Sequence, residues 1–239
     1  MMRTAEFVRR HSLPTRVLHW VNALSVFLVL MSGLQIFNAD PHLYWGQYGA
    51  SPDRALLSIG AHGFPHWATL PGWQDLALGR RWHFFFAWLL VFNSVTYLLI
   101  SIRDGHVRRD LLPTRTEVAP SHLLQDIWNH LRLRFPRGDA ARHYNVLQKL
   151  AYLGVIFMLG PLILATGLSM SPGFDARCPW LVTLLGGRQS ARTIHFSAAA
   201  LVALFILVHL TMVVLAGPWN EVRSMITGRY RITTGSSSR

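Results

Sequence analysis

The chain has 239 residues, enough for one domain or two small ones. Half of the residues are apolar and only 14% are charged, yet the net charge is +12 and the chain has nine tryptophans. This balance is typical of a membrane protein with aromatic belts, and because the basic residues lie between long apolar runs it argues against nucleic-acid binding. Cys178 is the only cysteine, which excludes an intramolecular disulfide, a cysteine-based zinc or iron–sulfur site and a covalently attached haem.

Four apolar segments are long enough to cross ~30 Å of hydrocarbon as helices. In chain order they are residues 17–37, 82–102, 146–168 and 193–216. The first is too long for the apolar part of a signal peptide and no cleavage site follows it, so we expect it to be retained. Lys149 is the only permanently charged side chain in the four segments, and Gly160-Pro161 predicts a kink in the third. The predicted fold is therefore an all-α, integral membrane four-helix bundle over residues 1–232, with a disordered tail at 233–239.

Basic residues set the expected orientation of this bundle. Arginines concentrate in the N-terminal tail, in the connection 103–145 and in the C-terminal tail, and fewer lie in the two other loops. The positive-inside rule then places both termini and the middle connection in the cytoplasm and the two other loops in the periplasm. Within the middle connection, apolar residues at helical spacing over 124–135 predict an amphipathic helix that lies on the membrane surface or packs on the ends of the bundle.

Histidines mark the candidate site, because ionisable side chains inside membrane spans are rare and usually functional. The first and second spans contain His19 and His83, and the fourth contains His195 and His209. The last two are 14 residues apart, which brings the second to within ~40° of the first around the helix and ~21 Å along it. Two imidazoles on one face, at two depths of the bilayer, can serve two flat cofactors stacked across it.

The depth of each histidine selects its partner. His19 and His209 are both about two turns from the cytoplasmic ends of their spans, whereas His83 and His195 both begin spans at the periplasmic level. The expected pairs are thus His19–His209 and His83–His195. Each pair can ligate one haem iron from both sides, and a six-coordinate haem suits electron transfer rather than oxygen chemistry. The alternative is that these histidines form hydrogen bonds between helices.

Four further residues are candidates for contact with a bound haem. Gly33 follows His19 by the same 14 residues, which puts bare backbone at the level of the periplasmic-side pair, where a macrocycle needs close approach. Arg16, Arg81 and Arg192 each lie within three residues of a proposed ligand and are candidates to pair with haem propionates. Anchoring at the membrane interface is the alternative role for these three arginines.

At these residues the chain resembles the bacterial cytochrome b561 and nickel-hydrogenase cytochrome b superfamily, over nearly its whole length. His19-Trp20, His83, His195 and His209 carry the resemblance. The segment 143–149 is similar to the gamma subunit of formate dehydrogenase. The aromatic loop motif Phe64-Pro65-His66-Trp67 and the ending Met-Ile-Thr-Gly-Arg at 225–229 are most similar to thiosulfate-reductase-type cytochromes b.

The resemblance implies two b haems, a location in the bacterial inner membrane and a site for ubiquinone or menaquinone near the cytoplasmic-side haem. That site carries over to Asn145, Gln148 and His209, which supply an amide pair and an imidazole edge as hydrogen-bonding groups. The implied partner is a periplasmic redox protein, such as a molybdopterin enzyme of the sulfite-oxidase-like or thiosulfate-reductase-like kind. Two alternatives to such an electron-transfer subunit remain: a self-sufficient superoxide:quinone oxidoreductase, and a transporter or scaffold without haem.

Overall fold

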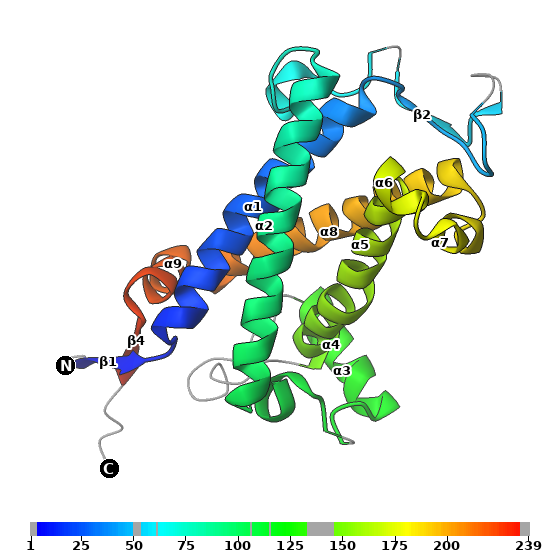
Figure 1. Cartoon of the computed structure of the whole chain (residues 1–239). Coiled ribbons are helices and arrows are strands. Elements are labelled where there is room, and N and C mark those ends of the chain that lie inside the picture. Colours follow the sequence, from blue (N-terminus) through cyan, green and yellow to red (C-terminus); the bar gives the residue numbers. More distant parts are fainter. Residues whose placement is uncertain are drawn as a thin grey trace. The chain divides into compact units, whose positions relative to one another are not determined.

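Four long apolar helices dominate the computed structural model of the chain (Figure 1). The structure describes residues 4–49, 54–60, 62–105, 107–114, 116–132 and 146–234. The helices that are long and apolar enough to cross a membrane are α1 (Leu13–Phe37), α2 (Leu76–Arg103), a composite third helix (Val146–Ser169) and α8 (Arg188–Ala216). The four predicted spans are therefore confirmed as helices.

Three of these helices begin four to six residues before the predicted spans, and two of the early starts have a visible cause. The Ser12 hydroxyl accepts a hydrogen bond from the amide of Thr15 at 3.3 Å, and the Asp75 carboxylate accepts one from the amide of Leu78 at 2.9 Å. Both are N-cap bonds, which satisfy amides that have no partner inside the helix. Hydropathy locates the apolar part of a helix, whereas its first turn is set by such caps.

The third helix is irregular next to Gly160-Pro161, where the sequence predicts a kink. It runs as α4 (Val146–Gly154), a π-helical turn (Val155–Leu159) and α5 (Gly160–Ser169). The amide of Gly160 donates to the carbonyl of Val155, five residues earlier. Because proline has no amide hydrogen and its ring crowds the preceding turn, the wider π turn accommodates Pro161 without ending the helix.

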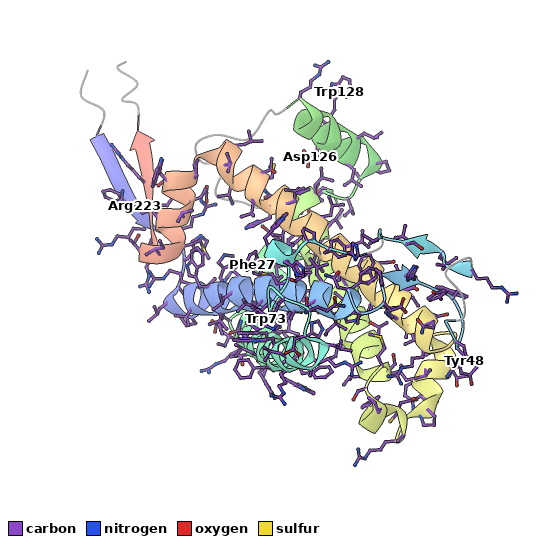
Figure 2. All side chains as sticks on the ribbon, turned by 90° about the horizontal axis from the view of Figure 1, so that it is seen from above. Phe27, Tyr48, Trp73, Asp126, Trp128 and Arg223 are labelled. Atoms are coloured by element: carbon purple, nitrogen blue, oxygen red, sulfur yellow. The ribbon has the colours of Figure 1, made fainter. Side chains whose placement is uncertain are left out.

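Shorter helices connect or follow the long ones. They are α3 (Pro120–Leu131), α6 (Pro172–Asp175), α7 (Pro179–Leu184) and α9 (Pro218–Thr227). Helix α3 covers most of the amphipathic segment expected at 124–135, and residues 133–145 lie outside the described part of the chain. Leu124 and Trp128 on α3 are both exposed and leave an apolar face of this helix open to lipid. The Trp128 side chain is labelled on α3 in Figure 2.

Two small antiparallel sheets add to the predicted all-α fold. Strand β1 (Thr4–Arg9) pairs with β4 (Arg229–Thr234), and β2 (His42–Leu43) pairs with β3 (Leu57–Ser58). The first sheet joins the two ends of the described chain next to α9 (Figure 1). It extends to Thr234, two residues into the tail that the sequence predicts to be disordered, and residues 235–239 lie outside the described part.

The chain forms two compact units, and each long helix contributes a segment to both. Unit 1 comprises residues 1–22, 93–153 and 206–239, and unit 2 comprises residues 23–92 and 154–205. In unit 1, Arg10 pairs with Glu221 at 3.2 Å, and Arg223 lies over the ring of Phe7 (Figure 2). These contacts hold α9 against the sheet of β1 and β4.

Unit 2 holds the long connection after α1 through polar contacts. The Asn38 side chain bonds both the amide and the carbonyl of Phe64, and the Gln35 amide donates to the carbonyl of Trp73 at 2.7 Å. Several aromatic side chains of this connection are nevertheless exposed, among them Tyr48 and Trp73 (Figure 2). The connection is therefore anchored at its base and presents aromatic side chains at its surface.

Candidate functional site

The structure brings the four intramembrane histidines together in the two pairs that their depths predict. The rings of His19 and His209, both in unit 1, have centroids 6.4 Å apart and are tilted by 60°. The rings of His83 and His195, both in unit 2, have centroids 6.2 Å apart and are tilted by 64°. All four residues are half-buried. Each unit therefore contains one pair of closely spaced imidazoles.

The spacing within each pair fits a haem iron held from both sides. A metal–imidazole bond is about 2 Å long and the bonded nitrogen lies about 1.2 Å from its ring centroid, so two trans imidazoles on one iron have centroids roughly 6.3 Å apart. The observed values of 6.4 and 6.2 Å both lie close to that distance. The spacing of the residues present thus fits an iron bound by two imidazoles.

Glycines lie directly against the rings of the pair in unit 2. A Cβ atom at Gly33 would lie 3.4 Å from Cε1 of His83, and one at Gly167 would lie 3.4 Å from Cε1 of His195. Any longer side chain at either position would enter the space beside the imidazole. The sequence singles out Gly33 for a close approach at this level, and the structure adds Gly167 as its counterpart on α5.

Hydroxyl groups next to these glycines contact the same two rings. Ser32 Oγ lies 3.3 Å from Nδ1 of His83, and Thr166 Oγ1 lies 2.9 Å from Nδ1 of His195. Ser32 and Thr166 are both fully buried. Sequence analysis missed these two residues, although a recurring Ser/Thr-Gly-Leu triplet at 32–34 and 166–168 was a signal that could have found them.

The pair in unit 1 has different neighbours. His19 packs edge-on against Trp20, whose indole nitrogen donates to the carbonyl of Met225 at 3.1 Å. Arg16 donates from Nη1 to the carbonyl of Ile226 at 2.6 Å. Both carbonyls belong to the 225–229 segment of the sequence resemblance, so this segment fixes the first turns of α1 beside His19.

The three arginines expected near haem propionates lie in different surroundings. Arg16 has a buried Nε without a hydrogen-bond partner in the described part of the chain, so it retains a donor for an anionic group. Arg81 is exposed on α2. Arg192 is bonded to the Asp40 carboxylate at 3.2 Å, to the carbonyl of His42 at 2.8 Å and to the carbonyl of Asp40. The structure thus gives Arg192 a role in anchoring the connection after α1, and its propionate contact stays a prediction.

Of the three residues expected at a quinone site, two are described. Gln148 is half-buried in the first turn of α4, His209 belongs to the pair in unit 1, and Asn145 lies outside the described residues. Next to Gln148, the buried side chain of Lys149 forms an ion pair with Glu117, with Nζ at 2.9 Å from Oε1 and 3.0 Å from Oε2. The one permanent charge within the four predicted apolar segments is therefore compensated.

Comparison with known proteins agrees with this arrangement. Residues 10–228 match the family described as prokaryotic cytochrome b561. The chain is also 30% identical over 200 residues to a protein from Azospira oryzae named as a putative protein-methionine-sulfoxide reductase subunit, YedZ1. That match covers 84% of this chain and 87% of the relative. All four histidines lie within the matched family region.

Proposed function

The chain belongs to the prokaryotic cytochrome b561 family, a family of membrane electron carriers, and on that premise we propose that it transfers electrons across the bilayer between quinone and a periplasmic oxidoreductase. The observation that carries the proposal is the presence of two imidazole pairs with ring centroids 6.4 and 6.2 Å apart. Haem, which the family implies, supplies reversible one-electron transfer at its iron when it is bound. Two b haems per chain, one at each pair, are part of the proposal.

The proposed ligands are His19 and His209 for one haem and His83 and His195 for the other. Each pair of imidazoles would hold one haem iron, and a haem held by two histidines would supply electron transfer rather than oxygen chemistry. Gly33 and Gly167 keep the space beside His83 and His195 clear of side chains. Arg16 has a free buried donor for a propionate, and Arg81 and Arg192 are proposed for the same role.

The arginine distribution supports an orientation with the chain ends and α3 in the cytoplasm of a bacterial inner membrane. The connection between α1 and α2 would then face the periplasm. Its exposed aromatic side chains, Trp45, Tyr48, Trp67 and Trp73, suit a docking surface for a partner protein.

The name of the Azospira relative suggests the kind of partner. It is described as a subunit of a protein-methionine-sulfoxide reductase, and we propose an enzyme of that kind as the partner of this chain. The sequence resemblance adds that such a periplasmic enzyme carries molybdopterin, with sulfite-oxidase-like and thiosulfate-reductase-like enzymes as the related classes. Aromatic anchors of the kind seen on the connection often dominate the binding energy of such interfaces.

A quinone site is proposed beside the pair in unit 1. Gln148 and Asn145 would donate amide hydrogens to a quinone carbonyl, with an edge of His209 as the third polar group. Gln148 lies in the first turn of the helix that carries the compensated Lys149, so a neutral quinone would not meet an unpaired charge at this end of α4. Haem reduction by ubiquinol and by menaquinol, measured separately, tests which of the two quinones the protein uses.

Purification of the chain with whatever binds to it tests the proposal. A pyridine haemochrome assay should give two b haems per chain, and the reduced-minus-oxidised spectrum should show low-spin haem. A molybdenum-containing protein should co-purify, and quinol should reduce the haems. A colourless protein would refute the proposal, and oxidation of superoxide by the chain without a partner would favour the self-sufficient enzyme.

Labelling of introduced cysteines tests the orientation. In a Cys178→Ser background, Tyr48→Cys should react with an impermeant thiol reagent in intact cells, whereas Ser121→Cys should not. Tyr48 and Ser121 are both exposed, so accessibility within the protein is comparable. The opposite labelling pattern would reverse the orientation and the proposed route of electrons.

A further inference from the structure

Ser32 makes a defined set of hydrogen bonds around the ring of His83. Its Oγ lies 2.7 Å from the carbonyl of Leu28 and 3.1 Å from that of Val29, so the single hydroxyl proton is donated to the backbone of α1. The oxygen then faces Nδ1 of His83 as an acceptor. The carbonyl of Val29 also lies 3.1 Å from this Nδ1, and a carbonyl has no proton to give. Both neighbours therefore require a proton on Nδ1 of His83.

Thr166 repeats this arrangement on a different helix. Its Oγ1 lies 2.7 Å from the carbonyl of Leu162 and 3.1 Å from that of Ile163, and it faces Nδ1 of His195 at 2.9 Å. The hydroxyl proton again goes to the backbone of its own helix, and the oxygen accepts from the imidazole. In both cases a glycine follows the hydroxyl residue and lies against the same ring.

A proton on Nδ1 leaves Nε2 as the atom with the free lone pair, which is the form that binds a metal. A hydrogen bond from Nδ1 to an acceptor also makes Nε2 more basic, and it fixes the rotation of the ring. A more basic axial ligand stabilises ferric iron relative to ferrous iron and so lowers the reduction potential.

We propose that Ser32 and Thr166 are positioning residues that hold His83 and His195 in the Nδ1–H form and lower the potential of the haem that these two histidines bind. The inference rests on the proposed function. It assigns to two buried hydroxyls a role that helix packing alone does not explain. It also predicts that the hydroxyls lower the reduction potential of only one of the two haems.

Isosteric removal of one hydroxyl tests the proposal. Thr166→Val keeps the shape of the side chain and removes the acceptor, whereas Thr166→Ser keeps the acceptor and removes a methyl group. Thr211→Val is the matched control, because the exposed Thr211 donates to the carbonyl of Leu207 at 2.8 Å in the same way but contacts no histidine among the described residues. The readouts are haem content, potentiometric titration and the low-spin EPR signals, with His195→Ala to identify which signal belongs to which pair.

Thr166→Val should raise the potential of the His83–His195 haem and leave the other unchanged. Loss of one hydrogen bond should change the ferric–ferrous equilibrium about threefold to tenfold, or roughly 30–60 mV upward. Ser32→Ala should act in the same direction with a smaller shift, because its contact of 3.3 Å is longer than the 2.9 Å contact of Thr166. A backbone carbonyl remains as an acceptor in both variants, that of Val29 for His83 and that of Ile163 for His195. Thr166→Ser and Thr211→Val should behave like the wild type.

Unchanged potentials in both Thr166→Val and Ser32→Ala would overturn the proposal, as would an equal shift of both haems or an equal shift in Thr211→Val. If the Thr166→Val protein does not retain the haem, the reduction potential of the Ser32→Ala protein tests the proposal, since that variant removes only the longer contact. Failure of the proposed function is visible separately, because the wild-type chain would then lack two haems before any substitution is made.

Discussion

The two histidine pairs have nearly the same spacing, but the groups around them differ. In unit 2, each ring lies against a second helix that presents a buried hydroxyl and a glycine in succession. In unit 1, His19 packs edge-on against Trp20, whose indole nitrogen donates to the carbonyl of Met225. The same unit also contains the side chains of Arg16 and Gln148 and the Lys149–Glu117 ion pair.

This difference indicates that the chain positions its two histidine pairs in two different ways. In unit 2, hydrogen bonds of 2.9–3.3 Å to Nδ1 fix the orientation of both rings. The pair in unit 1 lies in the half of the chain that also contains an unpaired buried guanidinium nitrogen and an amide side chain. On the proposed function, unit 2 is built for electron transfer alone, and unit 1 combines electron transfer with the binding of a substrate.

The largest expected effect is the loss of one haem at a time. His195→Ala should reduce the haem content from two per chain to one, and the remaining haem should still be reduced by quinol. His209→Ala should also leave one haem, but quinol reduction should be largely lost because the ligand and a quinone contact disappear together. Haem assays and stopped-flow reduction by a quinol analogue measure both results.

A reversed result would break the comparison between the units. If the His209→Ala protein is still reduced by quinol and the His195→Ala protein is not, the quinone site belongs to unit 2. Retention of both haems in either variant would show that the histidine pairs are not the ligands.

The glycines of unit 2 allow a more selective test. Gly33→Leu and Gly167→Leu should each displace a histidine ring, because even a Cβ atom would lie 3.4 Å from it. We expect the His83–His195 haem to be lost or weakly bound while the other is retained. Gly154→Leu is the matched control on the third helix, where a Cβ atom meets nothing within 4 Å. Equal loss of both haems in Gly33→Leu would mean general unfolding rather than a local effect.

Much of this organisation could be predicted from the sequence, because membrane burial imposes simple patterns. A membrane-spanning helix needs a long apolar run, and an ionisable side chain inside it is usually functional. These rules were enough for the four helices, now confirmed, and for the grouping of His19 with His209 and of His83 with His195. The depth of each histidine in its span depends only on helix geometry.

Features that depend on contacts between distant segments could not be predicted in this way. Strands β1 and β4 pair across more than 200 residues, and neither is apolar enough to attract notice. Ser32 and Thr166 look like ordinary small residues of membrane helices until the rings opposite them are placed. The Asp40 contacts of Arg192 likewise depend on how the connection after α1 folds back.

Loss of a single amide in unit 1 should have an intermediate effect. Gln148→Leu keeps both proposed haem sites and removes one donor, which costs ~1–3 kcal/mol if a quinone carbonyl is left unsatisfied. Quinol reduction should slow by about tenfold or more, with unchanged haem content and potentials. Gln148→Asn, which retains an amide, is the control. Wild-type kinetics in Gln148→Leu would remove Gln148 from the quinone site.

The smallest expected effect is a dependence of the stability of unit 1 on pH. The amide of Thr114 donates to Glu117 at 2.7 Å, and this bond, followed by the Lys149 ammonium, lowers the pKa of Glu117 below its ordinary value of 4.5. A carboxylate with a lowered pKa in the folded state stabilises that state fully above the unfolded pKa. Its contribution is lost as the pH falls through the folded pKa, so stability should decline below about pH 4.5.

Thermal unfolding of the purified protein between about pH 6 and pH 3, followed by haem absorbance, measures this contribution. Glu117→Gln should lower the unfolding temperature at pH 6 and flatten its fall in acid, because the titrating group is gone and Lys149 is left buried without its partner. Lys149→Met should flatten the acid response only in part, since the larger contribution from the Thr114 amide remains. Glu221→Gln is the control within unit 1, because it removes the more exposed ion pair with Arg10, worth at most ~1 kcal/mol. If Glu117→Gln and Glu221→Gln have the same effect, the Lys149–Glu117 pair is no more than a surface contact.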